Sequence, residues 1–148
     1  IGTGQQKDKL INALEDIQYS HCQWINWIDY SEVPAFWAAS TITYWALDDN
    51  PLDQMRLQAK LFEALASGTP AVIAVQGLMH EILSASNAGI TVPTGDADGM
   101  IQAINRLLND EVYYQIISAN ARQYAEINYA LQNHVDNYEL VLQEIVKS

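Results

Sequence analysis

The apolar run from Ala71 to Val75, AVIAV, limits the possible folds more than any other part of the chain. A half-buried strand alternates apolar and polar side chains, whereas a strand buried on both faces is apolar throughout. Strands of the second kind occur mostly in parallel sheets that helices cover on both sides. Gly68 and Pro70 end a predicted helix before the run, and Gly77 follows it in a turn. We therefore expect the central strand of a parallel sheet.

Helical and strand-like segments alternate around this run. Apolar residues at helical spacing predict helices near residues 10–17, 57–67, 78–85, 97–108, 112–127 and 131–145. β-Branched and aromatic segments predict further strands at residues 24–28, 41–47 and 89–92, and Ile1 is expected to end a strand before a glycine turn. Ser31 and Asp96 are expected to cap helices, with Pro34 in the first turn after Ser31, and residues 48–54 to form a loop. The class is α/β: a Rossmann-like, doubly wound parallel sheet with a helical C-terminal tail.

Composition excludes several functions. With 7 basic against 18 acidic residues the formal net charge is −11, which argues against nucleic-acid binding and against docking on anionic lipid. No apolar run approaches the ~20 residues of a membrane-spanning helix. Cys22 is the single cysteine, so no internal disulfide forms and a cytoplasmic location is expected. The 148 residues suit one domain.

Ligands of doubly wound sheets bind beyond the carboxyl ends of the strands, close to helix N-termini. Free backbone N–H groups and the positive end of the helix dipole suit a pyrophosphate there. Three junctions fit: Gly2-Thr3-Gly4, the loop before Lys60, and Gln76-Gly77-Leu78. The amides after Gly77 are expected to cradle phosphate, and the alternative is that Gly77 is an ordinary turn glycine.

The segment from Lys60 to Pro70, KLFEALASGTP, resembles the KxxEALAxGxP signature of the retaining glycosyltransferases of family 4, which have the two-lobed B-type fold. Nearly the whole chain agrees with this family. The agreement includes the G-x-G turn at Gly2 to Gly4, residues 27–36, Gly77 with Glu81, residues 89–96, Asn120-Ala121-Arg122, and the last helix. The order and spacing of these elements together are more specific than any one of them.

This resemblance implies the C-terminal, nucleotide-sugar-binding lobe over residues 1–148. Such an enzyme transfers a hexosyl group from a UDP- or GDP-sugar to a glycan or lipid-linked acceptor with retention. The acceptor site belongs to an N-terminal lobe outside this chain, and the full-length protein is expected to be at most peripheral to the inner face of the membrane. Because the first residues lack an initiator methionine, we expect a piece of a longer protein that is inactive alone.

The resemblance also assigns residues. The glutamate matching Glu63 holds the nucleotide ribose, since a carboxylate accepts hydrogen bonds from two vicinal hydroxyls; the alternative is a solvated glutamate paired with Lys60. The nucleotide-binding set is Glu63, Lys60, Gly4, Gly77 and Leu78. The family often has a second glutamate that meets the donor sugar, but Met55 occupies that position here. Met55 and Gln58, with Asp53 as an alternative, are therefore the donor-sugar candidates.

Other chemistry has weaker support. The three histidines share no metal-ligand spacing with one another or with Cys22, and we expect neither a metal nor a cofactor. Gly2-Thr3-Gly4 lacks the third glycine of a dinucleotide fingerprint. The tryptophans are expected to pack in the core and sheet, with Tyr44 and Trp45 as minor candidates near the base.

Two alternative functions stay open. One is a lobe of a nucleotide-sugar epimerase, and the other is a non-catalytic module, which the Met55 departure supports. The apolar stripe of the last helix favours contact with the missing lobe or self-association of the fragment.

Overall fold

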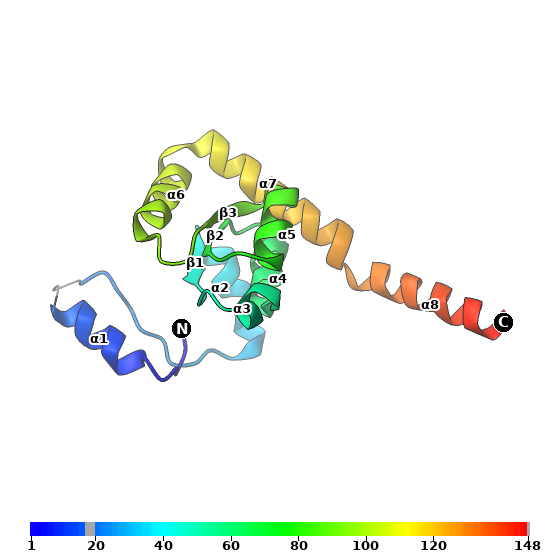
Figure 1. Cartoon of the computed structure of the whole chain (residues 1–148), viewed down its shortest axis with the longest axis horizontal. Helices are drawn as coiled ribbons and strands as arrows, with labels where there is room; N and C mark the ends of the chain where they lie inside the picture. Colours follow the sequence, from blue (N-terminus) through cyan, green and yellow to red (C-terminus); the bar gives the residue numbers. More distant parts are fainter. Residues whose placement is uncertain (17–19, 148) are drawn as a thin grey trace. The chain divides into compact units, whose positions relative to one another are not determined.

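The computed structural model of the chain describes residues 1–16 and 20–147. The chain divides into two compact units, Ile1–Ala35 and Phe36–Ser148. The first unit contains α1 (Lys7–Asp16), which confirms the helix predicted from Leu10, Ile11 and Leu14; Ile17 lies outside the described residues. The second unit contains the sheet and most of the helices (Figure 1).

The strand predicted at residues 24–28 is wrong. These residues have no regular secondary structure, and neither does Ile1. A strand requires a ladder of hydrogen bonds to a neighbour, whereas aromatic and β-branched composition expresses only a packing preference. Within the described part of this unit, one backbone bond joins the two segments, from Gly2 N to Ile25 O at 2.9 Å.

Local capping explains two further differences. Ser31 lies inside the 3₁₀ helix η1 (Tyr30–Glu32), so it does not cap α2 (Val33–Ala39), although Pro34 is in the first turn of α2 as predicted. Residues 48–54 are not all loop, because α3 (Pro51–Met55) begins among them. The Asn50 side chain accepts a hydrogen bond from Asp53 N at 3.0 Å, and Pro51 is the first helical residue.

The sheet is parallel, as predicted. Its strands are β1 (Thr43–Ala46), β2 (Ala71–Ala74) and β3 (Gly89–Val92), in the spatial order β1-β2-β3. All four residues of β2 are buried, which confirms the central strand expected from the apolar run. The register aligns Thr43, Ala71 and Gly89 across the three strands.

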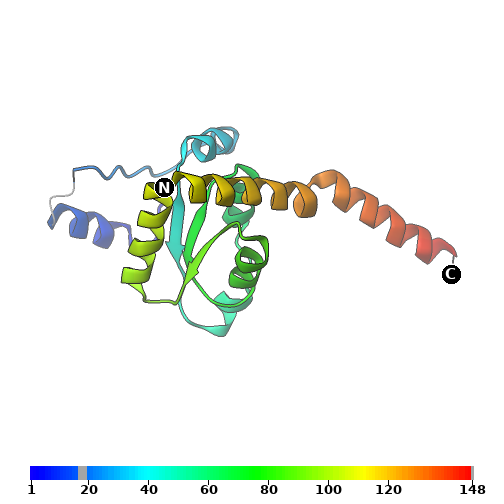
Figure 2. The same ribbon diagram turned by 90° about the horizontal axis from the view of Figure 1, so that it is seen from above.

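Helices cover both faces of this sheet (Figures 1 and 2). One core contains Ile73 of β2 with buried residues of α4 (Ala59–Ala66), α5 (Leu78–Ser86) and α7 (Glu111–Tyr129). The other contains Val72 of β2 with residues of α6 (Ala97–Asn109) and Ile117 of α7. Burying a side chain the size of Ile73 contributes about 1.5–3 kcal/mol. The doubly wound architecture is therefore confirmed.

Polar residues of α7 hold the C-terminal ends of α4 and α5. Ser118 Oγ donates to Gly68 O at 2.6 Å, and the Arg122 guanidinium donates to Ala66 O. Asn120 Nδ2 donates to Asn87 O at 3.1 Å at the end of α5. Carbonyl groups at helix ends lack partners within the helix, so these bonds satisfy them and fix both helices against α7. Gly68 has a φ of 69°, which confirms the predicted left-handed cap.

The last helix, α8 (Leu131–Lys147), lies outside the core. Every side chain from residue 131 to residue 146 is exposed, including the predicted apolar stripe. In both ribbon views α8 extends away from the sheet of its own unit (Figures 1 and 2). Among the described residues, no helix is both long and apolar enough to cross a membrane.

Candidate functional site

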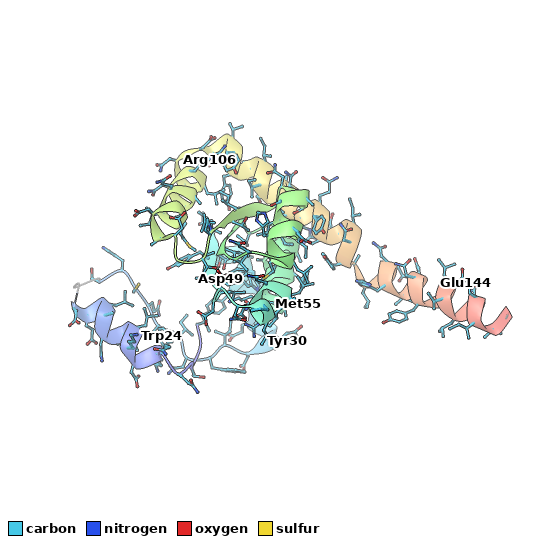
Figure 3. All side chains as sticks on the ribbon, viewed as in Figure 1. Trp24, Tyr30, Asp49, Met55, Arg106 and Glu144 are labelled. Carbon is cyan, nitrogen blue, oxygen red and sulfur yellow. The ribbon has the colours of Figure 1, made fainter. Side chains whose placement is uncertain are left out.

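The candidate site lies at the carboxyl ends of the three strands, where α4, α5 and α6 begin. In a parallel sheet each connecting helix starts at this edge, so its N-terminal N–H groups face the ligand side. The segment between β1 and α4 contains Asp49 and the short helix α3, which ends at Met55. Figure 3 labels Asp49 and Met55. Met55, which the resemblance predicts as a donor-sugar position, is 73% exposed.

The two charged residues of the signature lie on α4 but do not pair with each other. Glu63 is half-buried, and its Oε2 accepts a hydrogen bond from Trp37 Nε1 at 3.1 Å. Lys60 Nζ lies 4.4 Å from the centroid of the Trp45 ring. Within the described part of the chain, the predicted alternative of a Lys60–Glu63 ion pair is therefore wrong. The motif led us to expect a carboxylate near the start of the helix, and this was wrong: Glu63 lies in the middle of α4.

The pKa of Lys60 lies below its ordinary value of 10.5. Burial of the ammonium group is the larger cause, and the positive charge of Arg56 is the second. Arg56 itself is paired with Asp53, with Nη2 to Oδ1 at 2.6 Å. Asp53 is thus engaged by Arg56 and Asn50, which leaves it less available as the alternative donor-sugar contact.

Replacing Arg56 by glutamine is expected to raise the pKa of Lys60 toward 10.5. The value should stay below 10.5, because burial remains. Titration of the lysine ¹³Cε resonances by NMR measures this directly, and the other lysines of the chain are internal controls. An unchanged pKa of Lys60 would show that Arg56 is not one of its causes.

Two buried polar atoms near the start of α4 have no hydrogen-bond partner among the described residues. They are Oε1 of Gln58, which is the N-cap residue of α4, and Nε1 of Trp45 on β1. Leaving such a group unsatisfied costs about 1–3 kcal/mol. Both atoms are enclosed by protein, so a polar ligand could reach them only if the side chains around the start of α4 moved. Gln58 remains a predicted donor-sugar contact.

Gly77 occupies a turn whose geometry requires glycine, as the structural alternative predicts. It is the N-cap of α5 with φ 78°, and a Cβ atom there would lie 2.1 Å from Gln54 O. The backbone at the end of α3 therefore packs directly on the turn, which only glycine allows. Leu78, the first residue of α5, is 40% exposed.

A hollow of about 300 Å³ opens beside this turn. It is lined by the ends of β2 and β3 and the first turn of α5: Val75, Gln76, Gly77, His80, Thr91, Val92 and Pro93. His80 Nδ1 lies 2.5 Å from Thr91 Oγ1, which fixes the ring at the wall of the hollow. His80 was not among the residues predicted to bind the nucleotide. Its place one turn after the predicted phosphate turn was the signal that could have identified it.

A second hollow of about 410 Å³ lies between the ends of β1 and β2 and the start of α6. Tyr44 and Ala46 form one wall and Met100 another. Asp96 Oδ1 accepts from Gly99 N at 2.8 Å, which confirms the predicted cap of α6. Tyr44, which the sequence predicted as a minor candidate near the base, lines this hollow.

The predicted nucleotide-binding residues are thus divided among three places. Gly77 lines the first hollow, whereas Lys60 and Glu63 line neither of the two hollows. Gly4 belongs to the N-terminal unit, where its carbonyl accepts from Lys7 N at 3.0 Å at the start of α1. Among the residues that the structure describes, no group of three or more His, Cys, Asp or Glu is placed to hold a metal ion.

A parallel sheet covered by helices on both faces, with its site at the carboxyl edge, is the architecture of a lobe of a B-type glycosyltransferase. The chain belongs to the family of glycosyl transferases group 1, whose sequence model matches residues 1–110. No curated protein matches the sequence.

The solved structures that share the fold include the following two. Sucrose-phosphate synthase from Thermosynechococcus elongatus aligns with 99% of this chain at a TM-score of 0.78 and 18% identity. Anabaena HepE, solved in complex with UDP-glucose, aligns with 95% of it at a TM-score of 0.78 and 17% identity. The chain spans 38% of the length of each of these proteins.

Proposed function

We propose that this chain is the donor-binding lobe of a retaining glycosyltransferase of family 4. The enzyme transfers a hexosyl group from a nucleoside-diphosphate sugar to a glycan or lipid-linked acceptor. Family membership supports glycosyl transfer, and the fold shared with HepE, solved with UDP-glucose, supports a nucleotide-sugar donor. The acceptor site lies in a second lobe outside this chain, so the chain alone binds nucleotide without transfer. The single cysteine, Cys22, fits a reducing compartment, and we place the protein in the cytoplasm.

The observation that carries the proposal is that Lys60 and Glu63 lie on one helix without neutralising each other. Glu63 Oε2 accepts from Trp37, while its Oε1 accepts no hydrogen bond from the described residues. That oxygen and the remaining lone pairs are available to the vicinal hydroxyls of a ribose. Hydrogen bonds of this charge-assisted kind contribute about 1.5–3 kcal/mol each.

The diphosphate is assigned to the start of α5. The first backbone N–H groups of a helix have no partner inside it, and the helix dipole places positive potential there. In this chain those groups belong to Leu78 and Met79, next to the hollow that Gly77 and His80 line. Positive potential at this position stabilises the charge that develops on the leaving diphosphate, which is how such a lobe lowers the barrier.

Glu63→Ala is expected to weaken UDP or GDP binding by about tenfold or more, since it removes charge-assisted hydrogen bonds. Titration of the ¹⁵N-labelled chain with each nucleotide, followed by NMR chemical shifts, measures the dissociation constants. Glu144→Ala is the matched control, because it removes an exposed carboxylate from α8 (Figure 3). The absence of any shift near Glu63 or Gly77 at millimolar nucleotide would refute the proposal.

A second candidate is a non-catalytic nucleotide-sugar-binding module. The exposed Met55 at the position of the family's donor-sugar glutamate favours it. A full-length protein that binds sugar nucleotides but neither hydrolyses nor transfers them would support this alternative. Analysis of the products made by the full-length protein also separates transfer from epimerisation, which an epimerase with the same kind of lobe would catalyse.

A further inference from the structure

The order of charge on α4 is unfavourable for helix stability. Lys60 is the second residue of α4, where the partial positive charge of the helix N-terminus disfavours a cation. Glu63 follows three residues later, although a glutamate placed before a lysine stabilises a helix better than the reverse order. Residues three apart face each other closely enough to form an ion pair. An ion pair would offset part of this cost, yet the two side chains do not form one.

Two tryptophans from different elements contact the two charged groups instead. Trp45 comes from β1, and its ring lies beneath the Lys60 ammonium with 4.4 Å between Nζ and the ring centroid. Trp37 comes from α2, and its indole N–H donates to Glu63 Oε2 at 3.1 Å. The backbone carbonyl of Trp37 also accepts from Thr69 Oγ1 at 3.1 Å, which fixes α2 against the end of the α4–β2 connection.

We propose that Trp37 and Trp45 are positioning residues that hold Glu63 and Lys60 apart, so that both charges remain available to a bound nucleotide. This inference rests on the proposed function. A cation over an indole face is stabilised without a counter-ion, by about 0.5–2 kcal/mol. A carboxylate with one oxygen fixed by an N–H keeps the other oxygen in a set orientation, which lowers the entropy lost when a diol binds.

The contact of Lys60 with Trp45 also fits the lowered pKa of Lys60. The ring of Trp45 withdraws the ammonium group from part of its water, in keeping with burial as the larger cause of its lowered pKa. A new ion pair with Glu63 would have the opposite effect, because a nearby carboxylate favours the charged ammonium. The pKa of Lys60 therefore reports whether the two residues have come together.

The test uses the whole chain and UDP as the ligand. Trp37→Phe keeps a ring but removes the donor to Glu63, and is expected to raise the dissociation constant for UDP roughly fivefold. Trp45→Leu removes the ring face and is expected to have an effect of about the same size, whereas Trp45→Phe keeps a face and should stay within about twofold of wild type. Trp27→Phe is the matched control, since Trp27 is 79% exposed.

The second measurement is the pKa of Lys60, from its ¹³Cε resonance without nucleotide. Trp37→Phe frees Glu63 to pair with Lys60 and should raise this pKa, and the added change Glu63→Gln should abolish the rise. If Trp37 had a merely structural role, any change in the pKa of Lys60 would not depend on Glu63. If the Trp45→Leu chain does not fold, the test rests on comparing Trp37→Phe alone with Trp37→Phe combined with Glu63→Gln.

The two proposals fail in different ways. If Trp37→Phe leaves both UDP affinity and the pKa of Lys60 unchanged, while Glu63→Ala still weakens binding, the positioning role is overturned and the proposed function stands. If wild-type chain does not bind UDP or GDP, the proposed function fails. The dependence of the Lys60 pKa on Trp37 and Glu63 then still decides whether the tryptophan separates the two charges.

Discussion

Replacing Gly77 by alanine is expected to destabilise the chain by about 3 kcal/mol, since it combines a strained left-handed backbone with a steric overlap. The backbone has φ 78° at this residue, and the new Cβ would lie 2.1 Å from Gln54 O. Because Gln54 O is a backbone atom of α3, relief requires movement of the segment between β1 and α4. We therefore expect weaker UDP binding as well, because the start of α5 and the segment before Lys60 shift together.

Gly95→Ala is the control for the strain alone. Gly95 has φ 84°, but nothing lies within 4 Å of the Cβ position. Its replacement should cost only about 1 kcal/mol, the strain of a left-handed alanine. Urea denaturation of both variants gives the two free energies of unfolding. Equal losses would show that the contact with Gln54 does not matter.

Leu61→Ala is expected to destabilise the chain by about 2–5 kcal/mol, the usual cost of a cavity in a packed core. Leu61 is 0% exposed and packs α4 against β2, α5 and α7. Domains of this kind are stable by only about 5–15 kcal/mol, so the loss is a large share of the total. Because Leu61 lies between Lys60 and Glu63 in sequence, loosening it also disturbs the two charges, and UDP affinity should fall with stability.

Leu52→Ala provides the comparison for the same change at the surface. Leu52 lies on α3 and is 71% exposed, so its truncation should alter the free energy of unfolding by no more than about 0.5 kcal/mol. Denaturant midpoints of the two variants measure the difference. A loss for Leu61→Ala as small as that for Leu52→Ala would contradict the core described for α4.

The elements that the sequence predicted correctly are those whose signal is local. The apolar run of β2, the glycine cap at Gly68, and the periodic patterns of α5 to α8 each depend on residues close in the chain. The strand expected at residues 24–28 failed because strand formation depends on a partner that local composition does not reveal. The short helix α3 was missed because its capping residues, Asn50 and Pro51, are also typical of loops.

The same distinction applies to the candidate site. Lys60, Glu63 and Gly77 were selected from motifs, and Gly77 proved to occupy a position that demands glycine. The contacts of Lys60 and Glu63 could not be predicted, since Trp45 and Trp37 reach them from elements 15 and 26 residues away in sequence, distances that only the folded topology closes. His80 was overlooked because its partner, Thr91, lies on a different strand.

The exposure of α8 has a consequence for how unfolding is followed. Helix hydrogen bonds in α8 are formed without support from the core, so this helix is expected to fray before the sheet opens. Far-UV circular dichroism, which reports all helices together, would then mix gradual melting of α8 with cooperative loss of the core. In a chain whose Trp24 and Trp27 are replaced by phenylalanine, the fluorescence of Trp37 and Trp45, which contact α4, follows the core itself and is the better probe for the glycine and leucine variants.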